Sequence, residues 1–220
     1  MTNKDRQKAI DYSKNTSCPF IYVPIPKIAN TSTKATLYKW THPNKPIPRT
    51  EFGFDVHKES LFPWISLSKL AVGIPAKNCK LFVFVRNPID RVISVYQQKV
   101  LERRVVPNPM IKLGVSKKMT INDFIEEIVL KSNVLECNVH WRSVEYWIKP
   151  IENNPVLDIV PIQKASEYWS SNLSSVTPLF RSNETNKQTK KELHRELTDK
   201  NKYLLSDMYK YDLQILEKGI

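Results

Sequence analysis

The 220-residue sequence has only three cysteines, Cys18, Cys79 and Cys137, and they lie far apart. An odd number of widely spaced cysteines excludes a disulfide framework and does not match the ligand spacing of a zinc knuckle. We therefore expect free thiols, buried or half-buried, and no metal site. No apolar run approaches the roughly 20 residues that a membrane helix needs, so we expect no integral membrane segment.

The N-terminal residues 1–17 are polar and lack the apolar stretch of a signal peptide, so we expect a cytoplasmic protein. With 41% hydrophobic and 25% charged residues, the composition is that of a globular protein. Because no boundary between domains is visible, we expect a single domain over residues 1–220. Residues 1–18 are interpreted as an N-terminal extension of that domain.

The charge is unbalanced, with 34 lysines and arginines against 22 acidic residues, a formal net charge of +12. Such a surplus favours polyanionic partners, namely nucleotide phosphates, nucleic acid, acidic glycans or an anionic membrane. It does not distinguish among them, and a basic surface without any such partner remains the alternative.

Strand and helix signals alternate along the chain, which predicts a three-layer α/β fold with a mainly parallel sheet. The continuous apolar run at 80–86 is typical of a strand buried on both faces. The predicted strands are 19–25, 80–86 and 156–162. The predicted helices are 32–40, 60–73, 88–104, 120–131, 164–173 and 203–218, and residues 181–202 form a polar loop or exposed helix.

The first candidate site is the turn between the strand at 19–25 and the helix after it. Pro26 and Lys27 end the strand, and residues 28–33 lead into the helix. The unpaired amides of a helix N-terminus, together with the helix dipole, favour an anion. The turn contains no glycine and is not a Walker A loop. The alternative is that Thr31–Thr33 only cap the helix and that Lys27 is solvated.

The second candidate site is the segment "FVFVRNPIDRVISVY", residues 82–96, in which a strand ends at Arg86. Arg86 offers a planar fork to a phosphate, and Ser94 can add a hydroxyl from the following helix. In open α/β sheets, ligands bind at the carboxyl ends of strands. A salt bridge at the strand end is the alternative for Arg86. For Asp90 and Arg91 we expect ion pairs, either on the surface or between elements.

These segments resemble a known family. "PKIANTSTK" resembles the 5′-phosphosulfate loop of sulfotransferases that use 3′-phosphoadenosine 5′-phosphosulfate (PAPS), in particular the carbohydrate branch of the chondroitin, dermatan and heparan type. The Arg86 segment resembles the 3′-phosphate site of that family. "NVHWRSVEYW", residues 138–147, resembles its "VHWRPQ" segment. Asn30 departs from the Cys, Gly or Ala of the family, and we expect Asn30 to take the left-handed turn, since Asn tolerates such angles.

The resemblance implies a P-loop-like sulfotransferase fold, PAPS as co-substrate, and transfer to a hydroxyl or amine of a carbohydrate-type acceptor without a metal. The absence of a Golgi anchor suggests a bacterial or viral member, and the oligomeric state is open. The residues expected to bind the nucleotide are Lys27, Ile28, Ala29, Asn30, Thr31, Ser32, Thr33, Arg86, Ser94, Asn183, Thr185 and Lys187.

Catalytic roles follow from the chemistry that the resemblance implies. Charge builds on the bridging oxygen as the donor bond breaks, and Lys27 would stabilise it. His57 is the expected base for the acceptor proton, with Glu51 and Glu59 as alternatives; an exposed loop histidine is the other interpretation of His57. The residues expected to contact the acceptor are His140, Trp141 and Arg142, although core packing explains His140 and Trp141 equally well.

Two other functions are weighed against this one. A P-loop-like kinase would need Gly-Lys-Ser/Thr and a carboxylate that holds Mg²⁺ after a strand, and neither is evident. A basic nucleic-acid-binding or polyanion-binding protein would need clustered Arg and Lys with stacking aromatics, or a known motif. The lysines are scattered instead, so we expect no nucleic-acid partner.

Overall fold

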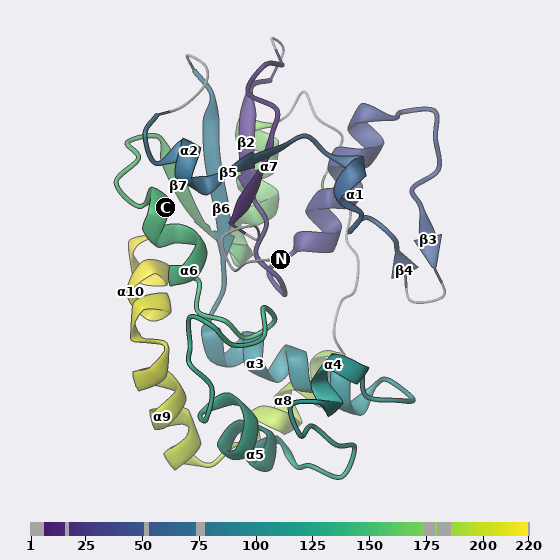
Figure 1. Cartoon of the computed structure of the whole chain (residues 1–220), viewed down its shortest axis with the longest axis vertical. Coiled ribbons are helices and arrows are strands. Elements are labelled where there is room, and N and C mark those ends of the chain that lie inside the picture. Colours follow the sequence, from purple (N-terminus) through teal and green to yellow (C-terminus); the bar gives the residue numbers. More distant parts are fainter. Residues whose placement is uncertain are drawn as a thin grey trace. The chain divides into compact units, whose positions relative to one another are not determined.

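The structure is a computed structural model that describes residues 7–15, 18–50, 53–73, 78–173, 179 and 186–219. It divides into two compact units, and each is described by itself (Figure 1). The first unit comprises Met1–Val85, Val144–Glu184 and Ile215–Ile220. The second comprises Arg86–Ser143 and Thr185–Gln214. The expected single domain over 1–220 remains a prediction.

The first unit contains a five-stranded sheet in the order β5-β1-β2-β6-β7. β2, β6 and β7 are parallel, and β1 runs antiparallel to both β2 and β5, so four strands share one direction. This confirms the predicted α/β class with a mainly parallel sheet. The strands are β1 Lys8–Asp11, β2 Phe20–Val23, β5 Trp64–Ser66, β6 Lys80–Val85 and β7 Leu157–Pro161.

The two central strands are buried because their sequences offer apolar side chains to both faces of the sheet. All four residues of β2 are buried, as are all residues of β6 except Lys80. Tyr22 of β2 and Phe82 of β6 lie 5.2 Å apart between ring centroids. Phe82 also contacts Tyr168, at 5.4 Å. Because Tyr168 belongs to α7 (Ala165–Asn172), that helix covers one face of the sheet.

The predicted helix at 60–73 is wrong in its middle. Trp64–Ser66 form β5, which pairs with β1, and the flanking helices are short (Figure 1). A stretch of only three residues, Trp64–Ser66, suits either structure, and pairing with the backbone of β1 makes it a strand. The remaining elements of this unit are α1 Asn30–Thr41, β3 Arg49–Thr50, β4 Gly53–Phe54, η2 Glu59–Leu61, α2 Leu67–Leu70, α6 Glu145–Ile148, η5 Lys149–Ile151 and η6 Ile162–Lys164.

The second unit is helical. Its core includes apolar side chains from α3, α5, α8 and α9. α3 and α5 each continue into a turn of π-helix, and a capping box of Thr120 and Asp123 begins α5. The elements are α3 Pro88–Tyr96, η3 Gln97–Leu101, α4 Asn108–Ile111, α5 Ile121–Phe124, η4 Ile125–Val129, α8 Lys187–Glu196, α9 Asp199–Met208 and α10 Lys210–Lys218, whose residues from Ile215 belong to the first unit.

A buried ion pair lies inside the second unit. Arg91 is fully buried, and its Nη2 lies 3.4 Å from Oδ2 of Asp212, which is also buried. Ser143 donates its hydroxyl to the same carboxylate, and Tyr209 donates its hydroxyl to the carbonyl of Trp141. The expected ion pair of Arg91 is therefore confirmed. These contacts join α3 to α10 and to the segment that precedes α6.

The three cysteines are free, as predicted: Cys18 and Cys79 are buried and Cys137 is half-buried. Of the helices that the structure describes, none combines the length and the apolar character needed to cross a membrane. Within the same described ranges, no three His, Cys, Asp or Glu side chains gather as metal ligands would.

Candidate functional site

The loop between β2 and α1 has an unusual backbone. Lys27 and Ala29 have φ angles of 68° and 48°, in the left-handed region that residues other than glycine rarely adopt. The expectation that Asn30 takes this turn is wrong, since Asn30 is the first residue of α1. Left-handed residues of this kind cost on the order of 1–3 kcal/mol each and cluster at functional sites. The surrounding fold therefore holds the loop in a shape that its own sequence does not prefer.

The same loop leaves amides at the start of α1 available to an anion. Ala29 is the N-cap residue, and no side chain caps the helix. The first helical hydrogen bond runs from the amide of Thr33 to the carbonyl of Ala29, at 2.9 Å. Capping by the hydroxyls of Thr31–Thr33 is thus not what the structure shows. Amides that precede the first helical bond, next to a left-handed residue, form the kind of concavity that binds phosphate-like groups.

Thr33 lies in the protein interior beside the loop. Its side chain is fully buried, as is Tyr22 on β2. Burial raises the pKa of the Tyr22 hydroxyl. The hydroxyl of Thr33 therefore faces the protein interior, whereas Thr31, which is half-buried, faces a different neighbour.

That neighbour is His57, the predicted base. Its Nε2 lies 3.2 Å from Oγ1 of Thr31, so the segment after β4 passes beside the loop. His57 is exposed, which leaves its ring accessible to a second molecule. Glu59, one of the alternatives, pairs with Lys8 at 3.6 Å. Glu51, the other alternative, lies outside the described residues.

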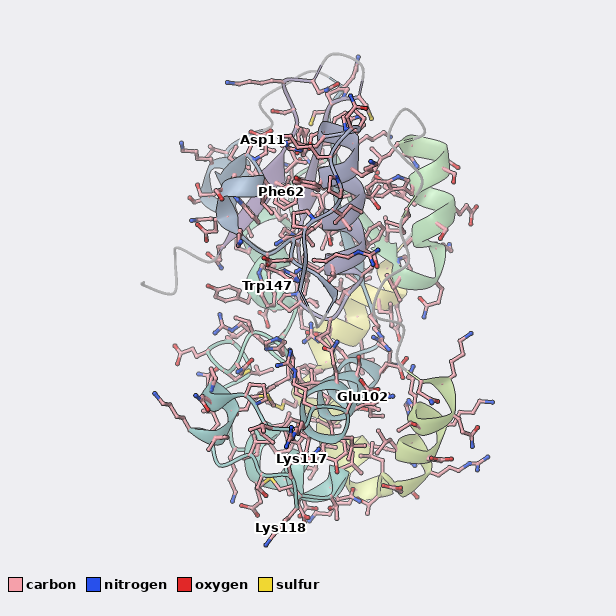
Figure 2. The ribbon with its side chains drawn as sticks, turned by 90° about the vertical axis from the view of Figure 1, so that its right-hand side faces the viewer. Asp11, Phe62, Glu102, Lys117, Lys118 and Trp147 are labelled. Carbon is pink, nitrogen blue, oxygen red and sulfur yellow. The ribbon has the colours of Figure 1, made fainter. Side chains whose placement is uncertain are left out.

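Lys34 lies on α1 one turn after Thr31 and was not singled out in the sequence. It is 5% exposed, and its Nζ lies 5.0 Å from the ring of Trp64 and 5.9 Å from that of Phe62, which is labelled in Figure 2. Burial lowers the pKa of Lys34 to about 8, against the opposing effect of Glu59. Its position one helical turn after Thr31 was the available signal, because residues at this spacing share a helix face.

In the second unit, Arg86 follows β6 directly and is half-buried. Asn87 caps α3, accepting hydrogen bonds from the amides of Ile89 and Asp90 at 3.0 and 3.2 Å. The Nε of Arg86 lies 4.0 Å from Oδ2 of Asp90. Ser94, the other residue expected at the 3′-phosphate, is 4% exposed on α3.

Asp90 takes part in the ion pairs expected of it. It accepts a hydrogen bond from Nζ of Lys190 at 2.6 Å and lies 2.7 Å from Nε2 of His194. Burial alone would raise the pKa of Asp90, but Lys190, His194 and Arg86 together lower it below its usual value. Neither Lys190 nor His194 was singled out in the sequence, because both lie about a hundred residues from Asp90.

The residues expected to contact an acceptor are mostly interior. Trp141 is fully buried, with its ring 5.7 Å from that of Phe124, and Arg142 is 2% exposed and donates to the carbonyls of Glu136 and Cys137. Core packing therefore accounts for Trp141, and the burial of both side chains does not match direct contact with an acceptor. His140 is half-buried and lies 2.7 Å from the side chain of Asn138.

The last three residues expected to bind the nucleotide, Asn183, Thr185 and Lys187, are only partly described. Asn183 and Thr185 lie outside the described residues. Lys187 is the exposed first residue of α8. The cap of α8 is Asn186, whose side chain accepts from the amides of Gln188 and Thr189 at 2.9 and 3.2 Å.

Comparison with known proteins gives one match. A family model described as "Sulfotransferase family" matches residues 11–218, nearly the whole chain. No curated protein and no solved structure matches.

Proposed function

Because the chain belongs to the sulfotransferase family, we propose that it transfers a sulfuryl group from PAPS to a hydroxyl or amine of a carbohydrate-type acceptor. The observation that carries the proposal is the loop after β2. Two left-handed residues and an uncapped helix start provide backbone amides, and Lys27 and His57 belong to the same unit as those amides. Family membership supports sulfuryl transfer, and the choice of donor and acceptor is our proposal.

In this mechanism the donor supplies the activated sulfuryl group, and the protein supplies charge and orientation. The amides of Ala29, Asn30 and Thr31 hold the 5′ end of the nucleotide. The ammonium of Lys27 stabilises negative charge that develops on the bridging oxygen as its bond to sulfur breaks. Because these donors are fixed before the reaction, they need little reorganisation when that charge appears.

His57 accepts the acceptor proton. A base must lie within hydrogen-bond reach of the group that it deprotonates, and an exposed ring leaves that space to a second molecule. The contact with Thr31, at 3.2 Å, orients the ring relative to the loop. Replacing His57 by Gln should lower kcat by about 10²–10⁴-fold, the usual contribution of general base catalysis.

The 3′-phosphate of the nucleotide is assigned to Arg86 and Ser94, and the adenosine to Asn183, Thr185 and Lys187. A guanidinium fork suits a phosphate better than an ammonium does. The net charge of +12 suits both the nucleotide donor and an acidic glycan acceptor.

The proposal is tested first by binding. Adenosine 3′,5′-bisphosphate should raise the melting temperature, whereas ATP with Mg²⁺ and an oligonucleotide should not. The Arg86→Ala variant should lose this shift. Stabilisation by ATP with Mg²⁺ alone would favour the kinase alternative, and stabilisation by the oligonucleotide alone the nucleic-acid alternative.

The second test measures transfer of radiolabelled sulfate from PAPS to a panel of glycans, lipids and phenols, with and without EDTA. We expect label in an acidic glycan, an EDTA-insensitive rate, and transfer slowed by about 10²–10³-fold in Lys27→Met. Label only in lipids or phenols would retain sulfuryl transfer and exclude the carbohydrate acceptor. Loss of transfer in EDTA would contradict the metal-free scheme.

A further inference from the structure

Three basic side chains of the second unit lie close to the carboxylate of Asp90. Nζ of Lys190 lies 2.6 Å from Oδ2, and Nε2 of His194 lies 2.7 Å from Oδ1. Nε of Arg86 approaches the same Oδ2 at 4.0 Å. The two nitrogens of Arg86 and Lys190 are therefore at most about 6.6 Å apart, the sum of their distances to Oδ2. One phosphate can bridge such a span with hydrogen bonds of about 2.9 Å to each.

These contacts join segments that are distant in the sequence. Asp90 lies in the first turn of α3, and Lys190 and His194 lie one turn apart on α8. A second contact joins the same helices, since the side chain of Gln97 donates to the carbonyl of Asn186 at 3.4 Å. The start of α8 is thus fixed relative to α3 at both Asp90 and Gln97.

Among the side chains that the structure describes, two cations, Arg86 and Lys190, approach the single carboxylate of Asp90. The neighbouring Arg91 is paired with Asp212. Two cations beside one carboxylate, with His194 in addition, favour an anion close by.

Asp90 itself should repel that anion. Its lowered pKa keeps it ionised at neutral pH, and a carboxylate beside a bound phosphate is unfavourable by Coulomb's law. If charge alone mattered, the site would bind phosphate better without Asp90. The role of an aspartate at this position is explained instead by the geometry that it imposes on its basic partners.

We infer that Asp90 is a positioning residue for the 3′-phosphate: it keeps Arg86 and Lys190 side by side and fastens α8 to α3, without touching the nucleotide. The inference rests on the proposed function, because it takes PAPS as the donor. Lys190 thereby becomes a second cation of the 3′-phosphate site.

The test compares two nucleotides by titration calorimetry. Adenosine 3′,5′-bisphosphate and adenosine 5′-monophosphate differ only in the 3′-phosphate, so the ratio of their affinities isolates that group. In Asp90→Asn we expect the affinity for the bisphosphate to fall about tenfold and the affinity for the monophosphate to stay unchanged. Removing a residue that orients a ligand-binding side chain typically costs about this much affinity. The matched control is Asp207→Asn, an exposed aspartate of the same unit, which should alter neither affinity.

Two more variants separate positioning from loss of structure. Asp90→Glu keeps the carboxylate and should restore most of the preference for the bisphosphate. Lys190→Met leaves Asp90 in place and should weaken bisphosphate binding alone, which serves as the test if Asp90→Asn does not fold. The inference is overturned, and the proposed function left intact, if Asp90→Asn binds the bisphosphate as tightly as the wild type or more tightly. If that variant does not fold, the same result in Lys190→Met overturns the inference. A wild-type protein that does not prefer the bisphosphate would overturn both.

Discussion

The two candidate phosphate-binding regions are built in different ways. The loop after β2 presents main-chain amides, held by left-handed angles at Lys27 and Ala29. The Arg86 region presents side-chain charges, held by ion pairs with Asp90. The first should therefore respond mainly to changes of backbone conformation, and the second mainly to changes of charge. The variants below test that contrast, from the largest expected effect to the smallest.

The largest effect should come from the buried ion pair that supports the second unit. Asp212→Asn leaves Arg91 buried without a counter-charge, which typically costs about 3–5 kcal/mol of unfolding free energy. Urea unfolding followed by circular dichroism measures this loss. Arg91→Met combined with Asp212→Leu should recover much of the stability, because apolar side chains need no charge partner. A loss below about 1 kcal/mol in Asp212→Asn would show that buried charge matters little here.

Lys27 is the exception in the first region, a charge that should act in catalysis rather than in folding. Lys27→Met should lower kcat by about 10²–10³-fold, as when one donor to a developing oxyanion is removed. Its unfolding free energy should stay near that of the wild type, because Lys27 is only half-buried. Steady-state kinetics and urea unfolding on the same samples check both parts. A rise in KM with unchanged kcat would place Lys27 in ground-state binding instead.

Lys34 tests this contrast from the opposite direction, because it is a buried charge in the first unit, where changes of backbone conformation are expected to matter most. Its folded pKa is about 8, against about 10.4 in an unfolded chain, so protonated Lys34 opposes folding below pH 8. That opposition fades as the pH rises towards 10.4. Lys34→Met should therefore stabilise the protein at pH 7 by up to about 3 kcal/mol and have little effect at pH 10. Equal effects at the two pH values would contradict the assigned pKa.

The smallest effect should come from Ala29→Gly. Glycine relieves the left-handed angle, worth about 1–2 kcal/mol, but gives the unfolded chain more freedom, which costs about 0.5–1 kcal/mol. The net gain should be at most about 1.5 kcal/mol. The loop should also become less preorganised, so affinity for adenosine 5′-monophosphate should fall slightly. Thermal unfolding measures the change in stability, and calorimetry measures the change in affinity. The control is Ala35→Gly, in a helical position of α1, which should only destabilise the protein.

Much of the sheet could be predicted from the sequence, because continuous apolar runs mark strands that are buried on both faces. β2, β6 and β7 lie where such runs predict them. β1 and β5 were missed because they are short, and β1 has a charged residue at each end. A strand of that kind is defined by its pairing partner, which a local pattern does not contain.

The candidate site was predictable to a similar extent. The order of strand, lysine, hydroxyl residues and helix pointed to the loop, but not to which residues turn left-handed. Neither Lys27 nor Ala29 favours that region on its own, so only the surrounding fold decides. The partners of Asp90 were invisible for another reason, since they lie on a helix about a hundred residues away.

The order of the segments has a consequence for synthesis on the ribosome. The first unit needs β7, which is translated only after residues 86–143 of the second unit. The second unit in turn needs α8 and α9, which follow β7. Neither unit can fold completely until later segments have been synthesised. The incomplete units therefore expose apolar surface, which favours aggregation or chaperone binding.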